Sequence, residues 1–333
     1  MGTDENSKRD WSRFILVMAG VSIAVLAGIS AALAYVDPYW VWRRSPPWLI
    51  ERNTPNDNLD NKMRFVKAMT VAQKRFDLVW IGSSRVYRGV DVGCLEGRAG
   101  YNLGVSGMML DEMRTYIRLA SEWGRPKTIV LGLDYFMFGS RDRPAPVDPK
   151  AYTVGWQLYA RLQTLISWSA IEDASKLPTA DAVSDGRWLN NGFKRTVPRP
   201  GSYTTLVQKG LKLDRVHTDP QLMSLLPTLL QEAKQSGLDF RLYIGPESDA
   251  YLSLIRDNGD WLDFQHWRAD MAEQAKRFGL PIVDMAEDHP FVHFDWAGGS
   301  TGNWIDTMHF GPPVGAYVAR RLGLATSCDA SPS

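Results

Sequence analysis

The sequence predicts an α/β protein: a three-layer α/β/α sandwich around a mostly parallel sheet, preceded by one N-terminal transmembrane helix. Three observations support this prediction. Short apolar segments alternate with longer amphipathic segments, which is typical of βαβ units. Turns containing glycine, serine or proline follow several of the apolar segments. An uncharged apolar stretch near the N-terminus is long enough to cross a bilayer.

The composition excludes two broad classes of protein. The 333 residues include 38 Lys+Arg and 37 Asp+Glu, which leaves a formal net charge of +1. A nucleic-acid partner is not expected, because phosphate binding needs a surplus of basic residues gathered on one face. Hydrophobic residues make up 44% of the chain, enough to bury a core, so a wholly disordered protein is excluded as well.

The apolar stretch is residues 14–36, which contain no charged residue. As a helix it would be about 35 Å long, enough to span the hydrocarbon core. Aromatic residues flank it in the manner of an interfacial belt: Trp11, Tyr35, Tyr39, Trp40 and Trp42. A cleaved signal peptide is the alternative, because Ala32-Leu33-Ala34 has the form of a cleavage site. The length of the run and the acidic residues before it favour a permanent anchor.

The orientation follows from weaker signals. Three basic residues lie close to the span on each side, so their numbers do not decide it. Arg13 adjoins the start of the span, whereas Asp37 follows its end. We therefore expect residues 1–13 to be a cytoplasmic tail of an inner-membrane protein. The folded domain would then be periplasmic or otherwise extracytoplasmic, joined by a juxtamembrane linker at residues 37–57.

The folded domain is predicted at residues 58–325. We expect helices at residues 58–75, 110–123, 221–235, 261–278 and 313–322, and strands at 76–81, 101–105, 127–133, 240–244 and 280–283. Residues 139–219 interrupt the alternation and are predicted to be an insertion over or beside the sheet, with a helix near residues 159–177. Residues 326–333 are small and polar, and we expect a disordered tail there.

The two cysteines are Cys94 and Cys328. They are too few for a disulfide framework or a thiolate zinc site. They could pair with each other in an oxidising compartment, but the position of Cys328 in the predicted tail favours two free thiols.

Three short motifs fall where ligands bind in open α/β sheets, at the carboxyl ends of strands. Gly82-Ser83-Ser84-Arg85 follows the first strand, and residues 102–107 (NLGVSG) span the end of the second. Asp306-Thr307-Met308-His309 precedes the last helix. A carboxylate three residues before a histidine can accept from Nδ1–H and leave Nε2 as a base. Each motif is weak alone, but their combination and order are specific.

In these motifs the chain resembles the SGNH (GDSL-like) hydrolase superfamily. The resemblance covers about residues 76–323 and implies a flavodoxin-like fold. It also implies that Ser84 is the nucleophile, His309 the general base and Asp306 the residue that orients His309. The backbone amides of Ser84 and Gly107 would form the oxyanion hole. A shift of the turn by one residue would make Ser83 the nucleophile, and this alternative remains open.

One motif departs from the family pattern. Asp134 occupies the position of an asparagine that donates to the oxyanion, and an ionised carboxylate can only accept hydrogen bonds. Asp134 either turns away to serve structure or substrate hydroxyls, or it slows the reaction. The Gly-Ser-Ser form of the first motif resembles membrane-anchored members, which are similar to alginate and teichoic-acid acylation factors.

Candidate substrate contacts lie near the motifs. Arg85 could hold an anionic group, Trp304 could stack on a sugar, and Asn102 is a further possible substrate contact. No metal and no cofactor are expected. His289 and His293 are four residues apart, but Pro290 between them argues against a regular helix that presents both to an ion.

The prediction is a membrane-anchored serine acyl-transfer enzyme, an O-acetyl esterase or O-acetyltransferase. It would act on a cell-envelope polysaccharide through a Ser-His-Asp triad and an acyl-enzyme on Ser84. Its partners would be an acyl-bearing polysaccharide or a small acyl donor, and a membrane acyltransferase. The alternative is a non-catalytic module that binds glycan or such an acyltransferase. A cleaved, secreted lipase is a third interpretation. Whether acyl groups are added or removed does not follow from the sequence.

Overall fold

The computed structural model describes residues 3–42, 58–139, 153–176, 186–196, 217–294 and 302–329. Residues 43–57 of the predicted linker lie outside the described residues. So do residues 140–152, 177–185 and 197–216 of the predicted insertion, and residues 330–333 of the tail. The chain forms two compact units, which we describe separately. One contains Met1–Lys62 and Thr153–Ala182, and the other contains Met63–Tyr152 and Val183–Ser333.

The second unit is built on a parallel sheet. Its strands are β2 (Gly100–Asn102), β1 (Leu78–Ile81), β3 (Thr128–Leu133), β6 (Asp239–Ile244) and β7 (Ile282–Asp284), in that spatial order. All four pairings are parallel. Every residue of β1 and β3 is buried, so both faces of the sheet are covered at its centre. The predicted α/β fold with a mostly parallel sheet is confirmed.

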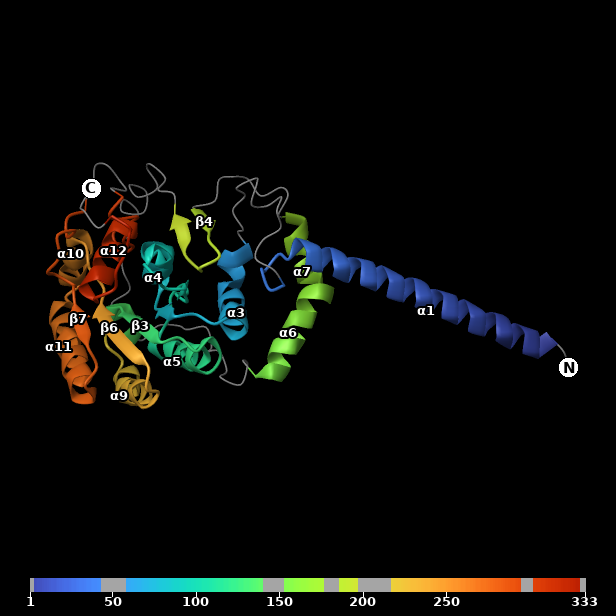
Figure 1. The fold of residues 1–333 in the computed structure, drawn as a ribbon, viewed down its shortest axis with the longest axis horizontal. Helices are drawn as coiled ribbons and strands as arrows, with labels where there is room; N and C mark the ends of the chain where they lie inside the picture. Colours follow the sequence, from blue (N-terminus) through green and yellow to red (C-terminus); the bar gives the residue numbers. More distant parts are fainter. Residues whose placement is uncertain are drawn as a thin grey trace. The chain divides into compact units, whose positions relative to one another are not determined.

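Helices flank this sheet (Figure 1). They are α3 (Asn58–Gln73, whose first residues belong to the other unit), α4 (Ser84–Gly89), α5 (Leu110–Leu119), α9 (Pro220–Gln235), α10 (Asp249–Asp257), α11 (Trp261–Phe278) and α12 (Pro312–Arg321). Helix α12 packs against α4, whereas α9 packs against both α5 and α11. Three short helical turns are η1 (Val92–Cys94), η2 (Ala120–Gly124) and η3 (Tyr135–Phe138).

The strand order places candidate site residues next to one another. After β1 the chain moves outward to β2 and then returns to β3 on the opposite side of β1. At such a reversal the loops after the two central strands diverge, and a crevice opens between them. Ser83 and Ser84 follow β1, and Asp134 follows β3, so the predicted site lies at this reversal.

The first unit contains α1 (Thr3–Val36), α6 (Val154–Ile166) and α7 (Trp168–Lys176). Within the described residues, one helical segment is long and apolar enough to cross a membrane, from Arg9 to Val36 of α1. Helices α6 and α7 come from the predicted insertion, and they pack against α1. The same insertion also contributes a hairpin of β4 (Gly186–Trp188) and β5 (Lys194–Thr196) to the second unit, which the sequence did not predict.

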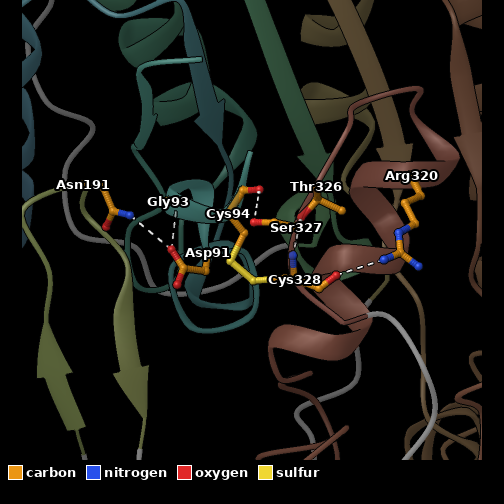
Figure 2. Close-up of a disulfide and its surroundings, with 8 residues drawn as sticks. All are labelled: Asp91, Gly93, Cys94, Asn191, Arg320, Thr326, Ser327 and Cys328. Carbon is orange, nitrogen blue, oxygen red and sulfur yellow. Dashed lines mark hydrogen bonds between the residues drawn. A yellow bond between two sulfur atoms is a disulfide. The ribbon is translucent and has the colours of Figure 1, made fainter. Parts of the chain in front are cut away.

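A disulfide joins Cys94, at the end of η1, to Cys328 (Figure 2). The backbone around it is also paired: Ser327 N–H donates to the Cys94 carbonyl over 2.9 Å, and Leu95 and Thr326 form an antiparallel bridge. The expectation of two free thiols was therefore wrong. Residues 326–329 belong to the folded unit, and the predicted disordered tail began too early.

Breaking this disulfide is expected to destabilise the second unit. The bond closes a loop of 234 residues, and cross-links of this kind typically contribute about 2–4 kcal/mol. Cys94→Ser and Cys328→Ser should lower the midpoint of chemical unfolding to a similar extent, because either change removes the same bond. Protein made in an oxidising compartment should show no free thiol when it is unfolded without reductant. Two titratable thiols under those conditions would contradict the pairing.

Candidate active site

The three residues of the predicted triad lie in hydrogen-bonding contact. Nε2 of His309 is 2.7 Å from Oγ of Ser84, and Nδ1 of His309 is 2.6 Å from Oδ2 of Asp306. Ser84 comes from the turn after β1, whereas the other two residues lie 222 and 225 positions later in the chain. The distances permit a proton to pass from the serine hydroxyl to the imidazole while the carboxylate holds the ring.

The position of Ser84 is determined by its neighbours in the turn. Ser83 is the N-cap of α4 and is fully buried, and its hydroxyl accepts from the Arg85 amide over 3.2 Å. Ser84 is the first residue of the helix and is partly exposed. Gly82 allows the turn to be tight, because a Cβ there would lie 2.5 Å from Cγ2 of Val86. Ser84 thus faces solvent, while Ser83 does not.

The loop before α12 places His309 and Asp306. Trp304 and Phe310 form an antiparallel bridge, and the Ile305 amide donates to the His309 carbonyl over 2.7 Å. The Ser248 hydroxyl donates to the Thr307 carbonyl over 2.6 Å. Prolines in the first turn of α12 begin the helix directly after the loop. Proline is tolerated there because amide hydrogens in the first turn have no acceptor within the helix.

Asp306 is held in its ionised form. Burial by itself would raise the pKa of this carboxyl, but the neighbouring charge of His309 and the hydrogen bonds it accepts outweigh burial and lower the pKa. Its Oδ1 accepts from the backbone amides of Met308 and His309 over 2.8 and 2.7 Å. An anionic Asp306 can therefore accept from Nδ1–H of His309 and stabilise a positive charge on the imidazole.

The segment after β2 runs close to the serine turn. The Leu103 and Val105 amides donate to the carbonyls of Trp80 and Gly82 over 2.7 and 2.9 Å. A Cβ on Gly104 would lie 2.9 Å from the Ser83 carbonyl oxygen, so only glycine fits there. Gly107 is exposed and has φ of +60°, a conformation that favours glycine and turns the chain sharply at this point.

Asp134 does not act as a donor here. Its Oδ2 accepts from the Ser83 hydroxyl over 2.5 Å, and its Oδ1 accepts from Nη1 of Arg85 over 3.0 Å. Of the alternatives left open by the sequence, the structure matches the one in which Asp134 serves structure. Its carboxylate connects β3 to the turn that presents Ser84.

Arg85 is the centre of a buried ionic cluster that also contains Asp134 and Glu247. Nη1 of Arg85 donates to Glu247 over 2.7 Å, and Nη2 donates to the Pro246 carbonyl. The two acids follow β3 and β6, and Arg85 follows β1, so the adjacency of these strands brings the three together. Burial raises the pKa of Glu247 to about 7 even though Arg85 opposes this.

The raised pKa of Glu247 predicts how the free energy of unfolding depends on pH. Between the ordinary value of 4.5 and about 7, the folded state keeps the Glu247 proton while the unfolded chain releases it. The free energy of unfolding should therefore fall by about 1–3 kcal/mol as the pH rises through this range. Glu247→Gln should remove that part of the pH dependence in chemical unfolding between pH 5 and pH 8. An equal pH dependence in both proteins would refute the assignment.

Two residues of α3 hold the segment after β2, and neither was expected from the sequence. The buried Lys67 ammonium donates to the carbonyls of Asn102, Gly104 and Gly192 over 3.0, 2.6 and 2.8 Å. Arg64 donates to both oxygens of Glu112 and to the Ser106 carbonyl. A signal for Lys67 was present, because it lies four residues after Met63 and four before Val71 on the apolar face of α3.

All three expected substrate contacts are corrected by the structure. Arg85 is 3% exposed, and its two terminal nitrogens donate to Asp134, Glu247 and the Pro246 carbonyl. Asn102 is buried and donates to the carbonyls of Val86 and Val90. Trp304 lies in the core and donates to the Phe291 carbonyl over 2.7 Å. Each of these side chains makes a contact inside the protein. A single sequence does not distinguish such a side chain from one that contacts a ligand at the surface.

Within the described residues, no group of three or more His, Cys, Asp or Glu side chains could hold a metal ion. His289 is instead hydrogen-bonded to backbone: Nδ1 accepts from the Phe291 amide and Nε2 is 2.9 Å from the Glu247 carbonyl. His293 lies beside Asp249.

No protein-family model and no curated protein sequence matches the chain. Among solved structures, it is similar to a lipase/acylhydrolase from Enterococcus faecalis, with 13% identity and a TM-score of 0.38 over 77% of this chain and 99% of that one. It is also similar to a protein described as a platelet activating factor from Streptococcus pneumonia, with 11% identity and a TM-score of 0.39 over 82% of this chain and 94% of that one. Both similarities are low, so the function has to be inferred from the residues of the site.

Proposed function

We propose that this protein is a membrane-anchored serine acyl-transfer enzyme. The observation that supports this most directly is the position of His309, which lies between Oγ of Ser84 at 2.7 Å and the Asp306 carboxylate at 2.6 Å. Such an arrangement activates a hydroxyl that is otherwise a weak nucleophile at neutral pH. A purely structural role would not require a partly exposed serine at the end of this relay.

The proposed reaction has two halves. Ser84 Oγ attacks the acyl carbonyl while Nε2 of His309 takes the hydroxyl proton, and the same proton passes to the departing alcohol. The ester formed on Ser84 is then attacked by water or by a glycan hydroxyl, with His309 accepting and returning a proton again. Asp306 stays ionised throughout and stabilises the imidazolium.

The proposed oxyanion donors are the backbone amides of Ser84 and Gly107. A family-type asparagine would add a third donor, whereas Asp134 accepts from Ser83 and Arg85. Losing one donor typically costs a factor of about 10²–10³ in rate. We therefore propose a slow transferase or esterase with a restricted substrate.

The proposed substrate is an O-acetylated polysaccharide of the cell envelope, or a small acyl donor that supplies the acyl group. The resemblance to membrane-anchored acylation factors supports this, as does the apolar span of α1. The Cys94–Cys328 disulfide supports a domain on the oxidising side of the membrane, because disulfides persist there and are rare in the cytosol. A membrane acyltransferase is the proposed protein partner.

A non-catalytic module that binds glycan, or such a partner, is the second candidate. It is favoured by one observation, the use of Asp134 as an acceptor where a catalytic member would have a donor.

The test uses the full chain in detergent micelles with an activated aryl acetate. Release of the aryl alcohol and a mass increase of one acetyl group should both occur, and both should disappear in His309→Ala. The adduct can then be offered deacetylated glycan or water to determine which one accepts the group. A folded protein that shows neither turnover nor adduct would contradict the enzyme and favour the binding module.

A further inference from the structure

Helix α6 presents an apolar face that the rest of the described chain leaves exposed. Four of its residues recur at every fourth position and therefore lie along one side of the helix. We call them the α6 stripe; they are Val154, Leu158, Leu162 and Ile166, with 66, 61, 48 and 56% of their surface exposed. The opposite side carries Ala160 and Thr164, which are buried. The only charged residue in the helix is Arg161.

This helix is attached to the end of the apolar span. The exposure of α1 falls only in its last two turns, where Leu33 is buried. Just beyond the helix, Nε1 of Trp42 donates to Thr164 of α6 over 2.9 Å, and the Tyr39 hydroxyl donates to Asp173 of α7 over 2.5 Å. The guanidinium of Arg161 lies 4.6 Å from the Trp42 ring.

These contacts limit how far α6 can lie from a bilayer crossed by α1. Trp42 is six residues beyond Val36, and six extended residues reach about 20 Å at most. Figure 1 shows α6 running across the end of α1 rather than along it. A helix in that place, crosswise to a spanning helix, is placed to lie in the plane of the headgroups.

Aromatic residues strengthen the assignment to the interface. Tyr35 and Trp42 at the exit of α1 are exposed, and so are Tyr159 of α6 and Trp168 at the start of α7, the last by 78%. Tyrosine and tryptophan concentrate at this depth because their rings are apolar at one end and polar at the other. The absence of a basic cluster on α6 indicates insertion by apolar burial rather than by attraction to anionic lipid.

We propose that the α6 stripe inserts into the interfacial layer of the bilayer that α1 crosses, which gives part of the insertion a role as a second membrane contact. This inference rests on the proposed membrane anchor. One spanning helix allows a domain to tilt and rotate freely. A second contact beside its exit holds the first unit in one orientation to the lipid surface.

The test places spin labels on the full chain in lipid nanodiscs. Single cysteines are introduced by Leu158→Cys and Leu162→Cys on the stripe, Val25→Cys in the span, and Ser175→Cys on the exposed part of α7. The native cysteines are paired and take no label without reductant. Collisions with oxygen, which partitions into lipid, are compared with collisions with a water-soluble nickel chelate.

Both stripe labels should resemble Val25→Cys, with a nickel-to-oxygen ratio several-fold below that of Ser175→Cys. Stripe labels that are as open to nickel as Ser175→Cys would overturn the inference while the anchor stands. Labels shielded from both agents would also overturn it, because a protein partner or second copy would then cover the stripe. Exposure of Val25→Cys to nickel would overturn the anchor and the inference together.

Discussion

Ser84→Ala is expected to reduce the rate of acyl transfer by a factor of roughly 10⁴–10⁶. The remaining rate would exceed the uncatalysed rate only by what substrate binding contributes. The reason is that Ser84 Oγ is the hydroxyl in contact with Nε2 of His309, at 2.7 Å, so its removal leaves the relay without its nucleophile. The measurement is the rate of aryl acetate turnover together with the intact mass of the full chain. Neither turnover nor the acetyl adduct should remain.

Ser83→Ala is the matched control, because the two serines are adjacent and the sequence could not decide between them. The Ser83 hydroxyl is buried and donates to Asp134, so it is not available for attack. Its loss removes the N-cap of α4 and should cost about 1 kcal/mol of stability while the acyl-enzyme still forms. Activity that survives Ser84→Ala but not Ser83→Ala would show that the nucleophile is misassigned.

Arg85→Met is expected to lower the free energy of unfolding by about 3–5 kcal/mol. Methionine leaves two buried carboxyls, those of Asp134 and Glu247, without the cation that now faces both. Chemical unfolding of the full chain in detergent should show this as a large shift of the midpoint. Proton uptake by Glu247 can offset part of the loss, so the shift should be larger at pH 8 than at pH 5.

Arg88→Met is the control for this variant. Arg88 lies one turn later on α4 and is partly exposed; it donates to Thr196 over 3.3 Å, and its guanidinium lies 5.5 Å from the Tyr87 ring. Its replacement should cost less than about 1 kcal/mol. Equal losses for the two arginines would mean that the charge cluster contributes nothing specific. A double variant, Arg85→Met with Glu247→Gln, should lose less than the sum of its single changes.

Several elements could be predicted closely from the sequence. The bounds of α11, residues 261–278, agree to the residue, and β3 and β6 differ from prediction by one residue each. Such elements have strong local patterns: a long amphipathic period for the helix, and short, largely apolar runs for the strands. Helix α10 was missed, since its nine residues offer little more than two turns of pattern.

The motifs of the site were predictable for a similar reason. Each is a short run in which residue type and spacing describe a local geometry, as in the pairing of Asp306 with His309 three residues apart. The contact of His309 with Ser84 joins residues 225 positions apart, and only their resemblance to a known order of motifs suggested it.

By itself, then, the sequence determined most helices and strands around the sheet, that the sheet is mostly parallel, and which few residues are candidates for acyl chemistry. The tertiary structure alone decided which polar side chains face inward. Arg85 is buried against acids that follow β3 and β6, Asn102 donates to carbonyls at α4, and Trp304 donates to the Phe291 carbonyl. Cys94 likewise meets Cys328, which lies 234 positions away in the sequence. The local pattern of apolar residues indicates whether a segment is a helix or a strand. The burial of a side chain depends instead on which distant elements pack against that segment.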